Sequence, residues 1–94
     1  MQKTATIQIG NTDNKLTQQE WSQFVEEMNK DISMLEIHFS GFSLPDKPWQ
    51  NACWVFCASE VIIDTLRKTI LPSLCKEFKH ESIALTVGDT EFVS

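Results

Sequence analysis

Residues 52–58 read Ala-Cys-Trp-Val-Phe-Cys-Ala, and every position in this run is apolar. A short apolar run is typical of a β-strand that is covered on both faces, whereas a strand with one wet face alternates between apolar and polar residues. We therefore predict that residues 52–58 form a strand and that something covers each of its two faces.

Three further strands are predicted from alternation, which places apolar side chains on one face and polar side chains on the other. They cover residues 4–9, 35–39 and 83–87. Gly41 follows the second of these strands and is a candidate for a β-bulge. After the last strand, Gly88 and Asp89 could turn the chain into a short hairpin with residues 91–93.

The first helix is marked by a capping box, because Thr17 is followed three residues later by Glu20. Leu16 and Trp21 stand at the positions of a hydrophobic staple around this cap. The apolar residues that follow fall on one helical stripe: Trp21, Phe24, Val25, Met28 and Ile32. The pattern predicts a helix over residues 18–33.

A second helix is predicted to begin after Ser59, a favourable N-cap residue. Its apolar residues recur every four positions: Ile62, Leu66, Ile70, Leu74 and Phe78. Pro72 interrupts the stripe, since proline removes one hydrogen bond and clashes with the carbonyl four residues earlier. The stripe keeps its phase across the proline, which favours one kinked helix over two separate helices.

The resulting order is β-α-β-β-α-β over a single domain, residues 1–94. Two right-handed crossovers onto one sheet predict an α+β fold, a ferredoxin-like two-layer sandwich. Its antiparallel sheet would have the strand order 4-1-3-2, with both helices on one face. The other face is then the informative one, because no helix covers it.

The charge balance weighs against nucleic acid as a partner. The chain has 13 acidic and 8 basic residues, a formal net charge of −5, whereas phosphate binding relies on clustered Lys and Arg. The longest apolar runs span only a few residues, so we expect no membrane partner. Residues 1–6 lack the apolar core of a signal peptide, and we expect a cytoplasmic protein.

The three cysteines, Cys53, Cys57 and Cys75, match no common zinc-ligand spacing. On one strand, Cys53 and Cys57 would lie about 13 Å apart at about 3.3 Å per residue, too far for a disulfide. We predict three reduced and mostly buried thiols.

The outward residues of strand 52–58 depend on how it pairs with the preceding strand. If Phe39 pairs with Val55, Val55 and the two cysteines of this strand face the helices, and Trp54 and Phe56 face outward. A one-residue slip would reverse this arrangement. Outward Trp54 and Phe56 would form an exposed apolar patch, and such patches usually mark a contact surface.

We predict that this patch makes the protein a small soluble interaction module, which self-associates as a homodimer or binds another protein through the helix-free sheet face. RNA binding is the less favoured reading: strand aromatics in RNA-recognition motifs stack bases, but here no Lys or Arg flanks Trp54 and Phe56. In a further reading, the loop or the C-terminal segment simply covers the two rings.

The alternative function is a small-molecule sensor or a small enzyme. Its pocket would be formed by the loop 43–51, His38 and the aromatic residues of strand 52–58. Two prolines stiffen this loop, and Trp49 could anchor it onto its own domain or into a partner. The candidate binding residues are Trp54, Phe56, His38, Trp49, Asp46 and Gln50.

No catalytic motif is present, which makes an enzyme the less favoured class. Glu36 and His38 lie two residues apart on one strand face, but a lone strand histidine is more often solvated or packed than catalytic. We therefore assign no catalytic residue and expect no metal and no cofactor.

Overall fold

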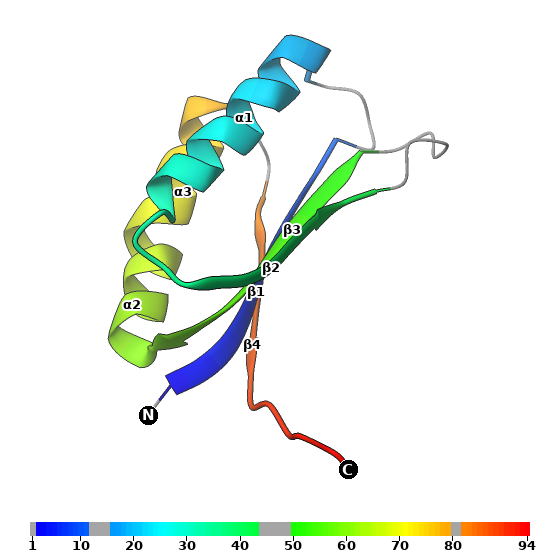
Figure 1. Ribbon diagram of the computed structural model, residues 1–94. Coiled ribbons are helices and arrows are strands. Elements are labelled where there is room, and N and C mark those ends of the chain that lie inside the picture. Colours follow the sequence, from blue (N-terminus) through cyan, green and yellow to red (C-terminus); the bar gives the residue numbers. More distant parts are fainter. Residues whose placement is uncertain (1, 12–15, 44–49, 80–81) are drawn as a thin grey trace.

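A computed structural model describes residues 2–11, 16–43, 50–79 and 82–94. Four strands form one antiparallel sheet, and the helices all lie on one face of it (Figure 1). The elements, in chain order, are β1 (Gln2–Gly10), α1 (Gln18–Asp31), β2 (Ile37–Phe42), β3 (Asn51–Ser59), α2 (Glu60–Thr65), η1 (Leu66–Ile70), α3 (Leu71–Glu77) and β4 (Ala84–Gly88). The molecule is 19 Å thick in its shortest dimension, as expected for one helix layer on one sheet.

The predicted α+β class with an antiparallel sheet and two helical stretches is confirmed. The strands lie in the order β2-β3-β1-β4, which is the expected 4-1-3-2 order read from the other edge. β3 and β1 occupy the centre, and β2 and β4 form the edges. The apolar run therefore lies in an interior strand.

The N-terminus of α1 has the predicted capping box. Thr17 accepts a hydrogen bond from the backbone of Glu20, and the Glu20 carboxylate accepts one from the backbone of Thr17. Leu16 and Trp21 are both buried, as expected for a hydrophobic staple. The helix ends two residues before the predicted boundary.

The second helical stretch runs without a break from Glu60 to Glu77, and its middle turn is a π-helix. The Leu71 N–H reaches back five residues to the Leu66 carbonyl. This wider turn lies directly before Pro72, which has no N–H to donate and cannot tolerate a normal helical turn in front of it. The prediction of one helix is thus confirmed, and the proline is accommodated by a π turn.

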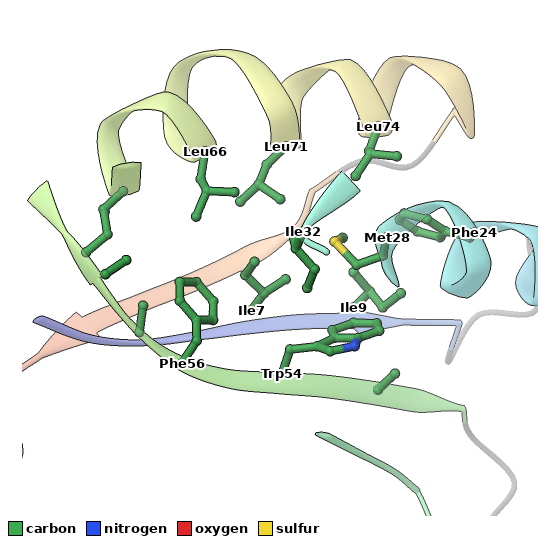
Figure 2. Packing of buried hydrophobic residues seen from close by; sticks show 14 of the residues in the cluster. Ile7, Ile9, Phe24, Met28, Ile32, Trp54, Phe56, Leu66, Leu71 and Leu74 are labelled. Carbon is green, nitrogen blue, oxygen red and sulfur yellow. The ribbon is translucent and has the colours of Figure 1, made fainter. Parts of the chain in front are cut away.

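The core fills the space between the sheet and the helices. Trp54 and Phe56 point from β3 toward the helix layer, alongside Ile7 of β1 (Figure 2). The Trp54 indole N–H donates a 2.7 Å hydrogen bond to the Asn29 side chain of α1. The Phe24 and Phe78 rings stack at 4.9 Å and join the two helical stretches.

The predicted outward orientation of Trp54 and Phe56 is therefore wrong, although the predicted pairing of Phe39 with Val55 is correct. The reason is a bulge: Ile37 pairs with Phe56 and Phe39 with Val55, so His38 is an extra residue in β2. Ile37 thus faces the helices while Phe39 faces away from them, and Val55 faces away with Phe39.

Two smaller expectations also need correction. The bulge lies at His38 and not at Gly41, which pairs regularly with Cys53. The expected hairpin beyond Gly88 is absent from the described residues, because residues 89–94 form no strand. They continue beyond the end of β4 instead (Figure 1).

Candidate functional site

The candidate site is the sheet face that carries no helix, which we call the open face. Cross-strand partners share a face, so the register of the four strands defines its members. In the middle of the strands they are Thr4, Thr6 and Gln8 of β1, Phe39 and Gly41 of β2, Cys53, Val55 and Cys57 of β3, and Ala84 and Thr86 of β4. Toward the strand ends the same register adds Gln2, Gly10, Asn51, Ser59 and Gly88.

None of these fifteen open-face positions carries a charged side chain, in a chain with 22% charged residues. The wet face of an antiparallel sheet is usually polar and often charged. Depletion of charge is instead characteristic of the central part of protein–protein interfaces. The open face therefore shares with such interfaces their depletion of charged residues.

Phe39 is the main apolar group on this face, with 60% of its surface exposed. A Cβ atom added to Gly41 would lie 3.1 and 3.2 Å from two atoms of the Phe39 ring. The ring therefore lies over the glycine, on the same side of the sheet. A side chain at position 41 would push the ring aside by a few tenths of an ångström, so Gly41 makes room for the Phe39 ring.

Cys53 and Cys57 lie on the open face on either side of Val55, and Thr4 Oγ1 lies 3.8 Å from Cys57 Sγ. All three cysteines are free, as expected, but they are half-buried and not fully buried. Cys75 lies on α3, where burial raises the pKa of its thiol against a smaller opposing effect of a hydrogen bond with the Ile83 backbone.

Among the described residues, the predicted binding residues occupy separate surroundings. Trp54 and Phe56 are in the core, and His38 lies exposed in the bulge of β2. Trp49 and Asp46 lie outside the described residues. The side chains of Trp54 and Phe56 thus face the helix layer and not the open face.

Gln50 belongs to a hydrogen-bond network within the chain. Its side chain exchanges hydrogen bonds with Gln18 at the start of α1 and accepts one from Asn11. Asn11 is the one buried polar residue among those described, at 1% exposure, and its side chain also bonds both backbone groups of Leu16 at 3.0 Å. This network fixes the end of β1 to the start of α1.

A separate cleft of about 260 Å³ lies between α2, η1 and β4. Its charged side chains include Asp64, which already pairs with Arg67 at 2.5 Å and lies 4.0 Å from Lys68. Among the described residues no group of His, Cys, Asp and Glu could hold a metal ion. The cleft thus provides no buried polar group for a ligand.

Comparison with known proteins identifies the fold only. No protein-family profile matches the chain, and no curated protein matches its sequence. The structure is similar to the crystal structure of At3g17210 from Arabidopsis thaliana, with a TM-score of 0.59 and 7% sequence identity over 100% of this chain and 99% of that chain. This likeness supports a small α+β fold.

A membrane-spanning helix is absent from the described part of the chain, where no helix combines the necessary length and apolar character.

Proposed function

We propose that this protein is a small soluble interaction module that forms a homodimer through the open face. The observation that carries the proposal is an uncharged sheet face with a largely exposed phenylalanine, Phe39, in an acidic chain. Two copies of this chain repel each other through their net charge of −5, but their open faces bring no charged side chains together.

The occupant we favour is a second copy, because the open face suits sheet-on-sheet packing. Apart from Gln8 and Phe39, the residues in the middle of this face are small: Thr, Cys, Val, Ala and Gly. Two such faces can pack about 10 Å apart, as in β-sandwiches. The pairing would also give β3 the second cover that its apolar sequence predicts.

The finer description of the fold and location belongs to the same proposal. We propose a ferredoxin-like sandwich, which the βαββαβ order and the strand order support. A cytoplasmic location is supported by three free cysteines, since reduced thiols are usual in that compartment. No described feature favours a nucleic-acid partner. The small-molecule alternative is less favoured because Trp54 and Phe56, which were expected to line its pocket, are buried in the core.

The experiment compares Phe39→Glu with Phe42→Glu. Both residues lie on β2 and are exposed to almost the same extent, 60% and 62%. Phe42, however, is the strand partner of the buried Ala52, so the register places it on the face that carries the helices. We expect the wild type and Phe42→Glu to sediment as dimers and Phe39→Glu as a monomer. Circular dichroism should show an intact fold in all three.

Two results would contradict the proposal. One is a wild type that remains monomeric at sub-millimolar concentration. The other is a dimer that both substitutions weaken equally, because the contact would then not depend on the open face.

A further inference from the structure

The segment after β4 exposes the most accessible apolar side chains of the described residues. Phe92 and Val93 are 93% and 86% exposed, well above Phe39 on the open face. Residues 89–94 form no strand and lead away from the sheet, on the side opposite the helices (Figure 1). Two adjacent apolar side chains in water are thus available for a contact outside the chain's own core.

The start of this segment is attached to β1. Asp89 accepts a 2.9 Å hydrogen bond from the Lys3 ammonium group, and this ion pair raises the pKa of Lys3. The Thr90 hydroxyl makes a hydrogen bond with the Thr4 hydroxyl, and Thr4 belongs to the open face. These contacts direct the chain past the margin of the open face before Phe92 is reached.

The reach of the segment matches the gap between two packed sheets. From Thr90 to Val93 an extended chain spans about 10 Å at about 3.3 Å per residue. Face-to-face sheets also lie about 10 Å apart. Side chains at positions 92 and 93 would therefore arrive at the level of the sheet of a copy packed on the open face.

We propose that Phe92 and Val93 of each copy pack against the other copy and act as a pair of reciprocal arms at the edge of the open-face contact. This inference rests on the proposed homodimer. A second copy is the occupant because the segment leaves its own domain at the margin of the open face, so its contact would be continuous with the sheet contact. In a two-fold dimer the same residues make this contact twice.

The test substitutes both side chains, Phe92→Ser with Val93→Ser. The matched control is Val61→Ser, since Val61 is a similarly exposed apolar residue, at 76%, but lies on α2 in the helix layer. We expect the dissociation constant of the dimer, measured by sedimentation equilibrium, to rise at least tenfold in the double variant and to stay unchanged in the control.

A second measurement locates the arm. A photo-reactive benzoylphenylalanine placed at position 92, mixed with isotopically labelled chain, should give cross-links between labelled and unlabelled copies. Only cross-links within one copy, or a double variant that dimerises like the wild type, would overturn the arm while leaving the open-face dimer intact. A monomeric wild type would overturn the proposed dimer, and the arm with it.

Discussion

Asn11→Ala should be strongly destabilising, because Asn11 is a buried polar residue that joins the end of β1 to the start of α1. Its side chain bonds the Leu16 carbonyl, the Leu16 N–H and the Gln50 side chain, each at 3.0 Å. Leu16 is itself buried, so truncation leaves a buried N–H and a buried carbonyl without this partner. Each such group costs about 1–3 kcal/mol when it is unsatisfied.

The expected loss is about 2–4 kcal/mol for Asn11→Ala, a large part of the roughly 5–15 kcal/mol that stabilises a typical domain. With an m-value of about 1.5 kcal/mol per M, the urea midpoint should fall by about 1–3 M. The assay is urea unfolding followed by circular dichroism, at one protein concentration for all variants, because self-association would add concentration-dependent stability.

Gln50→Ala is the matched control, because it removes the third partner of Asn11 but leaves both bonds to Leu16. Its side-chain bonds are to Gln18 and Asn11 near the surface, and we expect it to cost less than about 1 kcal/mol. The reasoning is refuted if Asn11→Ala unfolds within about 0.5 kcal/mol of the wild type. It is also refuted if the two variants are equally stable.

Three further predictions concern the helix cap and the open face. Thr17→Ala should cost about 1 kcal/mol because it removes the N-cap bond, and an unchanged urea midpoint would contradict this. Bonds from the Thr17 backbone and then its side chain lower the pKa of Glu20. The stabilisation from the Glu20 carboxylate is therefore present above the unfolded-state pKa of Glu20 and lost as the pH falls through its folded-state pKa. The wild type should thus be more stable than Glu20→Gln at neutral pH but not in acid. A stability difference that does not change with pH would contradict this prediction. Gly41→Ala should displace the Phe39 ring and weaken dimerisation in sedimentation, while alanine's advantage of about 0.5–1 kcal/mol in a strand keeps the fold stable. Unchanged association would show that the ring position is unimportant.

The elements and their order could be predicted from the sequence because each has a local signal. The capping box at Thr17 and the alternation in β1 are set by neighbouring residues, and both are present as predicted. The described elements also follow the order that the pattern indicates, including a continuous helix across Pro72. Local chemistry of this kind does not depend on how the sheet is assembled.

The two faces of β3 could not be assigned in the same way, because residues 52–58 show no alternation. The assignment depended on the partner strand, and one extra residue at His38 reversed it. Nothing in the sequence around His38 marks a bulge. Glycine is common at bulges, so the sequence predicted the bulge at Gly41 and not at His38. Side-chain size was the signal available: a Trp and a Phe each bury about 150–250 Å², far more than Cys or Val, so the core gains most from Trp54 and Phe56.

The open face observed in the structure differs from the one that the sequence predicts, and so does the argument for self-association. Outward Trp54 and Phe56 would have made a strongly apolar patch, whereas the observed face has Phe39 among thiols, hydroxyls and small residues. A face of this kind can be wet in a free monomer. In the proposed dimer, the driving force for pairing would therefore come from the area of the face and its lack of charge, and less from a few large rings. In the proposed dimer, stability and association are linked: because the second copy would bind the native state alone, the unfolding midpoint should rise with protein concentration. Phe39→Glu should remove that concentration dependence while leaving the unfolding of the dilute protein nearly unchanged, since Phe39 contributes little to the core of the single chain.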